Sequence, residues 1–275
     1  MKKKITAICL CVALVAIAVV GASLAYFTDT DKADNTFTAG GVKIKLIEQQ
    51  SNEDHTGFVP YTGDKVLMPI VGSAQGEKYP NGQPKAANYI DKVVTIENTG
   101  KSAAWIRAYY AVPSDLDDGY ETFNAGANIL HGNFGNKMTE NGLATTYENE
   151  WKWMNNGKWQ YFETVMDGVS YNVYFADYYQ PVAAGATTEQ FICGVYLDKN
   201  VDMKDGKYFD PRYPDADLSI LEGTVHYPVF AVAVQAEGFD SAAAAMDAAF
   251  GAHYNPWGTP LPTGSNPSAR SIFTL

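Results

Sequence analysis

Five aspartates in one loop are the residues of this sequence whose type and spacing most directly indicate chemistry. They are Asp202, Asp205, Asp210, Asp215 and Asp217. Carboxylate oxygens are the ligands that Ca²⁺ prefers, and extracellular modules often bind it through them. The spacing Asp202-x-x-Asp205 differs from the helix-loop-helix calcium pattern, and a solvated acidic loop is the competing interpretation. We predict a weak calcium candidate at these residues and no other cofactor.

The four histidines are scattered over different segments. They are His55, His131, His226 and His253. None lies in the His-Glu-x-x-His spacing that places two zinc ligands on one face of a helix. The sequence also contains no Gly-x-Ser-x-Gly turn and no phosphate-binding glycine loop. We therefore predict no catalytic residues and no enzyme.

Cys193 is a candidate nucleophile, because a lone cysteine with a histidine elsewhere in the chain can serve in that role. It lies between Ile192 and Gly194 in a predicted strand over residues 190–197. A cysteine in such apolar surroundings is more often a small buried hydrophobe. We favour burial.

An aromatic cluster offers flat rings that sugars could stack on. It comprises Trp151, Trp153, Trp159 and Tyr161. The same alternation suits a sandwich core or cross-strand pairs, which is the commoner use of such residues. We favour the core and keep a carbohydrate-binding or adhesin-type module as an alternative.

The first residues of the chain have the pattern of a secretory signal peptide. Lysines at residues 2–4 precede an uncharged apolar run over residues 5–20. Ser23 and Ala25 then occupy the small-residue positions that signal peptidases read, so we predict cleavage between Ala25 and Tyr26. The mature protein is then secreted, with no stable membrane span.

Composition narrows the function classes. Removing the three leader lysines from 20 basic residues leaves 17 against 31 acidic ones, a formal charge of −14. Nucleic acids and anionic lipid surfaces both require basic protein surface, so we exclude nucleic-acid partners. Cys193 is the only cysteine after the leader, so no disulfide forms within the mature chain.

Period-2 alternation and apolar runs predict mostly strands. Residues 42–47 begin the core, and residues 66–71 form an edge strand within a long loop. Residues 89–97 and 104–112 are predicted to pair with each other through the turn at residues 98–102.

The second half of the chain continues this pattern. Residues 159–166 and 169–176 are predicted to form a tight hairpin around Asp167-Gly168, and residues 226–236 form a central strand. Residues 114–150 read as an insertion with a short helix near residues 120–130, and residues 198–217 as a loop.

The predicted fold class is mainly β: a jelly-roll-like antiparallel β-sandwich with short helices and long loop insertions. The domain covers residues 42–254 and includes a helix at residues 241–250, N-capped by Asp240 or Ser241. A flexible tail follows over residues 255–275.

Several segments resemble one family of exported proteins. They are GASLAYFTD at residues 21–29, NTFTAG at 35–40, VTIENTG at 94–100, WIR at 105–107 and AVQA at 233–236. The chain resembles the TasA/camelysin-type family of Gram-positive proteins, whose leaders a SipW-type signal peptidase removes. The resemblance implies a jelly roll, and it makes a SipW-type signal peptidase an expected partner. Camelysin-type members have been described as metalloproteases, but the resemblance supplies no ligand positions.

Residues 26–41 are predicted to form an extended N-terminal arm, with Phe27 and Phe37 as its apolar anchors. An extended segment can add to a sheet edge of another subunit. The competing interpretations are that the arm pairs within its own subunit or stays disordered.

We therefore expect a secreted structural protein, a self-assembling biofilm-matrix or cell-surface fibre subunit located in the extracellular matrix or at the cell surface. Its partners would be a SipW-type signal peptidase and further copies of itself. The alternatives are a secreted camelysin-like metalloendopeptidase and a carbohydrate-binding module.

Overall fold

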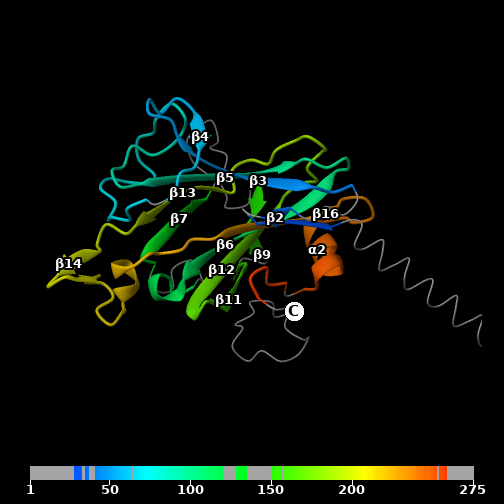
Figure 1. Cartoon of the computed structure of the whole chain (residues 1–275). Coiled ribbons are helices and arrows are strands. Elements are labelled where there is room, and N and C mark those ends of the chain that lie inside the picture. Colours follow the sequence, from blue (N-terminus) through cyan, green and yellow to red (C-terminus); the bar gives the residue numbers. More distant parts are fainter. Residues whose placement is uncertain are drawn as a thin grey trace, which may run out of the picture.

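The protein is a sandwich of two antiparallel β-sheets, with one helix packed on the outside (Figure 1). A computed structural model describes residues 28–32, 35–36, 41–63, 65–119, 128–134, 150–155, 158–252 and 254–258, the first two ranges by their backbone alone. The prediction of a mainly-β sandwich is confirmed. Within these residues, no helix is both long and apolar enough to cross a membrane.

The first sheet, called sheet 1, is built around the long strand β6. Its order is β11 (Tyr161–Met166), β12 (Val169–Tyr178), β6 (Ala104–Pro113), β16 (Val229–Gln235), β1 (Thr28–Lys32) and β2 (Asn35–Thr36), with β8 (Trp151–Lys152) also paired to β12. The predicted central strand at residues 226–236 is therefore confirmed as β16, which lies between β6 and β1.

The second sheet, sheet 2, faces the first. Its order is β4 (Phe58–Pro60), β3 (Ile44–Ser51), β5 (Ile90–Asn98), β13 (Ile192–Leu197) and β7 (Leu130–Phe134). Short elements lie outside both sheets: the β9 (Met154–Asn155) and β10 (Lys158–Trp159) pair, the β14 (Asp202–Lys204) and β15 (Lys207–Phe209) pair, and the 3-10 turns η1 (Ser114–Leu116) and η2 (Ser219–Glu222).

The chain wraps between the sheets in the manner of a jelly roll. It passes from β5 in sheet 2 to β6 in sheet 1, returns to sheet 2 at β7, and crosses again from β12 to β13 and from β13 to β16. As a result the first and last strands of the sandwich, β1 and β16, are neighbours in sheet 1.

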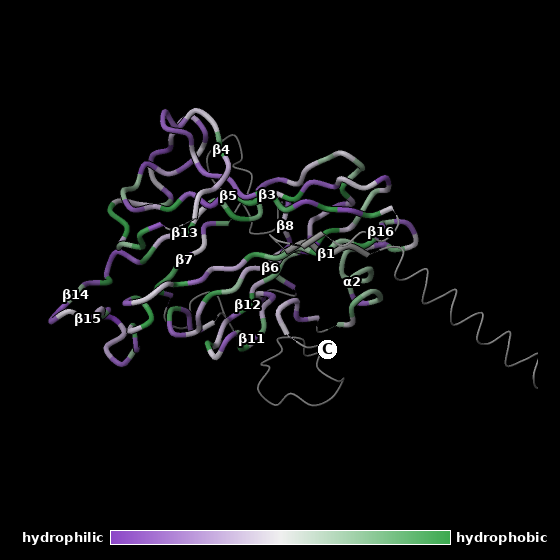
Figure 2. Tube along the Cα trace, viewed as in Figure 1, coloured by the Kyte–Doolittle hydropathy of each residue, from purple (hydrophilic) through white to green (hydrophobic). Residues whose placement is uncertain are grey.

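Apolar side chains on the facing sides of the sheets form the inner core. Alternate residues of β6, among them Ile106 and Tyr110, meet Val94 and Ile192 of sheet 2. Figure 2 shows hydrophobic residues gathered along the strands of the sandwich and hydrophilic loops near β4 and β14. A strand that is apolar on both faces must be covered on both, so sheet 1 needs a second covering layer.

That second layer is α2 (Ala242–Phe250), which packs on the outer face of sheet 1. Ala245 and Met246 contact the face that carries Tyr109 and Val232, and we call this cluster the outer core. The side chain of Ser241 accepts a hydrogen bond from the Ala244 amide, and the helix ends at Gly251 with φ 86°. The predicted helix, with its cap, is confirmed.

The predicted pairing of residues 89–97 with 104–112 is wrong. The two segments are strands, β5 and β6, but they lie in opposite sheets. Asn98, fully buried, turns the chain between them: its amide donates to the carbonyls of Ser102 (2.9 Å) and Val182 (2.8 Å). A short glycine-containing linker fits a hairpin or a crossing between sheets equally well, and contacts distant in sequence decide between them.

Two hairpins share an Asp-Gly turn. Asp167-Gly168 joins β11 to β12 with φ angles of 51° and 82°, so that predicted hairpin is confirmed. Asp205-Gly206 joins β14 to β15 with φ angles of 53° and 78°. Two consecutive residues with positive φ are the mark of a type I′ turn, so the predicted loop at residues 198–217 contains a hairpin.

Residues 66–71 do not form the predicted edge strand. They make only isolated bridges, Pro69 to Leu197 and Val71 to Ala87. Pro69 has no amide hydrogen, so the segment forms no continuous ladder. Ile70 is buried, but Val66 is 76% exposed. Among the described residues, the edge strands of sheet 2 are β4 and β7.

Two further segments differ from expectation at their ends. The predicted helix near residues 120–130 is wrong at its end, since Asn128 bridges to Asp117 and Leu130 begins β7; residues 120–127 lie outside the described residues. In the predicted tail, the amide of Asn255 donates to Thr164 (2.7 Å) and Trp257 packs in the outer core. Residues 259–275 of that tail lie outside the described part.

Candidate functional site: the edge of β16

The structure pairs the N-terminal segment with the last strand of the sandwich. β1 runs antiparallel to β16, with Thr28 opposite Val234 and Thr30 opposite Val232. β2 then pairs back onto β1, so these two strands form a hairpin at this edge of sheet 1 (Figure 1). The predicted arm at residues 26–41 thus lies on its own chain where it is described.

The strand that receives β1 is apolar on both faces. Ala231 and Ala233 belong to the inner core, whereas Val232 and Val234 belong to the outer core, and none is more than 2% exposed. On its other side β16 is fully paired with β6. Without β1, an apolar strand would present free backbone groups at the sheet edge, which is the surface on which another strand can be added.

β1 itself is polar, with the sequence TDTDK. β1 joins β16 by main-chain pairing. A segment of the same sequence from another chain would therefore make the same pairing. Phe27 and Phe37, the predicted anchors of the arm, lie outside the residues whose side chains are described. The same holds for Ser23, Ala25 and Tyr26 of the predicted cleavage site.

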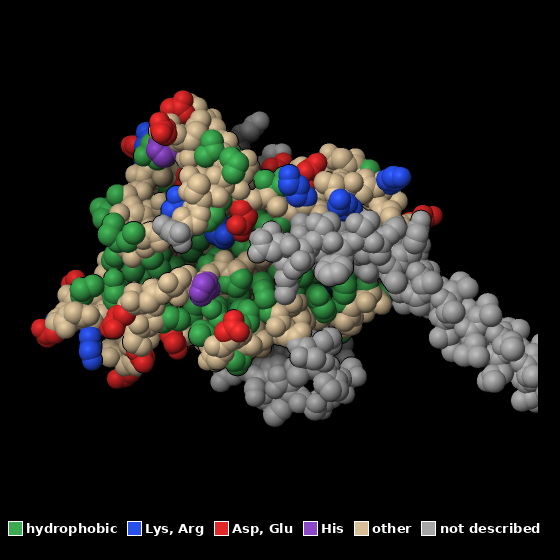
Figure 3. All heavy atoms as spheres, viewed as in Figure 1, with side chains coloured by type: hydrophobic (Ala, Val, Ile, Leu, Met, Phe, Trp, Pro, Cys, Tyr) green, Lys and Arg blue, Asp and Glu red, His purple; other side chains and the backbone are tan. Residues whose placement is uncertain are grey.

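The five aspartates of the calcium candidate are not brought together. Among the described residues, which include all five, no group of three or more His, Cys, Asp or Glu side chains is placed to hold a metal ion. Asp210 is instead paired with Arg212, and Asp217 accepts a hydrogen bond from the Ser219 amide. Figure 3 shows acidic side chains dispersed over the visible face.

A polar cluster that the sequence analysis missed lies beside this loop. Asp198 Oδ2 is 3.0 Å from His131 Nε2, and Asp198 Oδ1 is 2.9 Å from Arg212 Nη2. Burial acts to raise the pKa of Asp198, but hydrogen bonds from His131 and Asn200 and the charge of Arg212 outweigh it and hold the pKa well below its usual range. The cluster joins β7 to the loop after β13. Arg212 Nη2 also lies 2.6 Å from Asp210 Oδ2, so the two carboxylates share one guanidinium group.

The remaining histidines play separate parts. His55 stacks on Tyr79 with ring centroids 3.7 Å apart, and His226 is exposed on the segment before β16. His253 lies outside the described residues.

Cys193 is partly buried as a residue, and its thiol group points into the protein. Its Sγ lies 3.0 Å from Gln190 Oε1, and burial raises its pKa to about 12. The thiolate is the nucleophilic form of cysteine, so a thiol with this pKa is inert near neutral pH.

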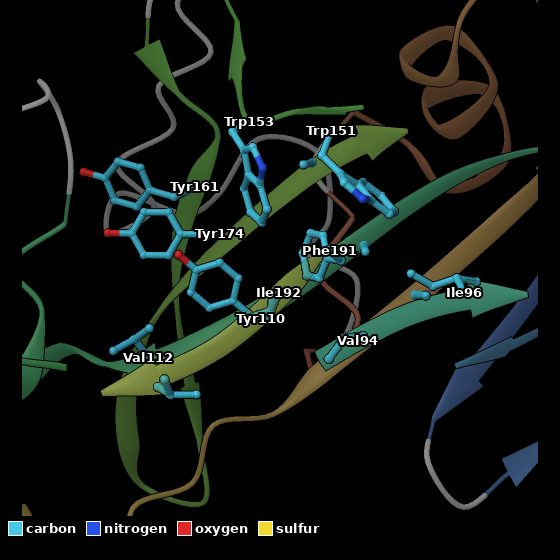
Figure 4. Close-up of a cluster of buried hydrophobic side chains, with 14 of the residues drawn as sticks. Val94, Ile96, Tyr110, Val112, Trp151, Trp153, Tyr161, Tyr174, Phe191 and Ile192 are labelled. Atoms are coloured by element: carbon cyan, nitrogen blue, oxygen red, sulfur yellow. The ribbon is translucent and has the colours of Figure 1, made fainter. Parts of the chain in front are cut away.

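The aromatic cluster is core and not a sugar platform. Trp151 and Trp153 are fully buried, and Trp159 and Tyr161 are no more than 3% exposed. Figure 4 shows Trp151 and Trp153 on either side of Phe191, between the sheets. A platform needs exposed ring faces, so these residues supply none.

Comparison of the chain with known proteins identifies no relative. No protein-family model, no curated protein and no solved structure matches it. The candidate site therefore rests on the edge of β16 and the N-terminal hairpin that covers it.

Proposed function

We propose that this chain is a secreted structural protein, a self-assembling subunit of an extracellular-matrix or cell-surface fibre. A SipW-type signal peptidase would remove residues 1–25, and copies of the mature chain would be the assembly partners. The observation that supports this proposal most is the pairing of β1 with β16. It places the first segment after the predicted cleavage site on an apolar sheet edge.

The proposed mechanism is strand donation. A mature subunit whose N-terminal hairpin leaves its own sheet exposes the β16 edge, and the hairpin of a neighbour pairs there in the same register. The main-chain hydrogen bonds lost in one subunit are regained between two, as in domain swapping. Each subunit donates one hairpin and receives one. When the donor and the recipient neighbours are different subunits, the contact is head-to-tail and extends into a filament, whereas mutual exchange between two subunits would close as a dimer.

Engineered cysteines test the register directly. Thr30 and Val232 are opposite each other in the β1–β16 pairing. Such Cα pairs are about 4.5–5.5 Å apart, a distance that a disulfide can span. In a Cys193→Ala background, Thr30→Cys subunits are mixed with Val232→Cys subunits, assembled and oxidised. We expect crosslinked dimers of one subunit of each kind inside the fibres.

The matched control replaces Val232→Cys by Ala231→Cys. Ala231 is equally buried but faces the inner core, so the register predicts little crosslinking to Thr30→Cys. A double variant, Thr30→Cys with Val232→Cys in one chain, should oxidise to a locked monomer that forms fibres only after reduction. Fibres that grow unchanged from the oxidised double variant would exclude strand donation, and electron microscopy that finds no fibres from the unmodified mature protein would exclude the function.

A further inference from the structure

We propose that Asp117 is a pH-sensitive latch, which holds the turn at residues 114–119 against β12 more tightly in acid than at neutral pH. This inference concerns the opposite end of sheet 1 from β1 and does not depend on fibre assembly.

The carboxyl group of Asp117 connects this turn to sheet 1. Asp117 follows η1, is 3% exposed, and accepts hydrogen bonds at Oδ2 from the Tyr174 hydroxyl (2.6 Å) and the Asn172 amide (3.2 Å). Asn172 Nδ2 also donates to the main-chain carbonyl of Asp117. Both partners belong to β12, so one side chain and its own backbone anchor the turn.

The main chain ties the same point to β7. Asp117 forms a β-bridge with Asn128, and the Ile129 amide donates to the Leu116 carbonyl (2.9 Å). Gly119, with φ 80°, lies so close to the Tyr161 ring that a Cβ there would be 3.0 Å from it. The turn is therefore packed tightly enough that its carboxyl group has little access to water.

The groups that face this carboxyl group are neutral or negative. Tyr174 and Asn172 donate as neutral groups, and the adjacent Asp118 carries a charge of the same sign. Tyr227, from the segment before β16, contributes a buried, neutral hydroxyl whose pKa is raised by burial and by the charge of Asp117. No lysine, arginine or histidine of the described chain forms an ion pair with Asp117. A buried carboxylate without a cation favours the protonated form.

Burial raises the pKa of Asp117 to about 6, against the effect of the hydrogen bonds from Tyr174 and Asn172. In the released turn the carboxyl group returns to its ordinary value of 3.8. A folded pKa above the unfolded one stabilises fully below pH 3.8, and that stabilisation is lost as pH rises through about 6. The equilibrium constant for release of the turn should rise on the order of tenfold between about pH 5 and pH 7.5.

The aromatic core provides a spectroscopic readout of this change. Tyr174 stands in a stack of four tyrosines, with centroid separations of 5.3 Å to Tyr161 and 5.2 Å to Tyr110, and 5.2 Å from Tyr110 to Tyr227. Figure 4 shows Tyr161, Tyr174 and Tyr110 in this arrangement. Ionisation of Asp117 next to the Tyr174 hydroxyl should alter the near-ultraviolet circular dichroism of the stack.

Hydrogen exchange of the full mature chain tests the latch. Exchange of amides at residues 114–119, corrected for the intrinsic pH dependence, should accelerate about tenfold from pH 5 to pH 7.5 in the wild type. Asp117→Asn should remove this dependence. The control Asp118→Asn removes an equal charge from the exposed neighbour and should retain it.

A direct titration keeps the inference testable if Asp117→Asn does not fold. The ¹³C carboxyl resonance of Asp117 in the wild type should titrate near pH 6, together with the near-ultraviolet signal. A carboxyl group that titrates near its ordinary value, or an Asp117→Asn variant with the wild-type exchange profile, would overturn the latch.

Discussion

Arg107 and Asp177 form a two-point ion pair on the outer face of sheet 1, with Nε 2.6 Å from Oδ1 and Nη2 2.9 Å from Oδ2. They are directly opposite in the pairing of β6 with β12, and their side chains are 7% and 9% exposed. The guanidinium group also lies 4.8 Å from the centre of the Phe175 ring. Two charges that have lost most of their water thus compensate each other, with the ring beside the guanidinium group.

Replacing one member of this ion pair should destabilise the protein more than replacing both. Asp177→Ala leaves a buried guanidinium without its partner, which should lower the free energy of unfolding by about 3–5 kcal/mol. The double variant Arg107→Met with Asp177→Leu removes both charges and should lose far less. Urea denaturation of both variants measures the difference. A double variant as unstable as Asp177→Ala would contradict this expectation, because the loss would then not come from an unpaired buried charge.

The crossing from β5 to β6 should depend on Asn98. Asn98→Ala removes the donors to Ser102 and Val182 and the acceptor for the Gly100 amide (3.0 Å), so the crossing loses three hydrogen bonds of a fully buried side chain. We expect a loss of about 3 kcal/mol in the free energy of unfolding. Thr99→Ala, at the exposed neighbouring position, serves as control and should lower the free energy of unfolding by only a small fraction of that amount. Equal losses in the two variants would contradict this role.

Acid should weaken the cluster around Asp198. Because its pKa is lowered in the folded protein, its contribution to stability is present above the ordinary value of 3.8 and is lost as pH falls through the folded pKa. Asp198→Asn should therefore destabilise at pH 7, by about 1–2 kcal/mol, and differ progressively less from the wild type below about pH 4. Thermal unfolding across this range, compared with Asp215→Asn from the same loop, measures the effect. A difference that does not diminish in acid would contradict it.

The Cys193 thiol should resist alkylation until the protein unfolds. With a pKa of about 12, its thiolate fraction at pH 8 is lower than that of a free cysteine by about a thousandfold. Iodoacetamide should therefore label it slowly in buffer and rapidly in urea, as followed by mass spectrometry. Rapid labelling of the folded protein would contradict this prediction and support Cys193 as a nucleophile.

The sequence determined those features whose cause lies within a few residues. Asp167-Gly168 specifies its own hairpin because both residues tolerate positive φ, and Ser241 and Gly251 delimit α2 by their capping chemistry. The apolar run of β16 indicates a buried strand wherever it lies in the sheet. The alternation of Trp151 and Trp153 with other residues likewise favours their burial.

Tertiary structure decided which elements meet. β5 and β6 are adjacent in sequence and carry a plausible turn, yet each pairs with strands distant in the chain, because the inner core is completed only when they face each other across it. His131, which contacts Asp198, and Asn172 and Tyr174, which contact Asp117, each lie 55 or more residues away in the chain. Backbone preferences and hydrophobic period act locally, whereas strand pairing and the placement of buried charges depend on the packing of the whole sandwich, which no single segment encodes.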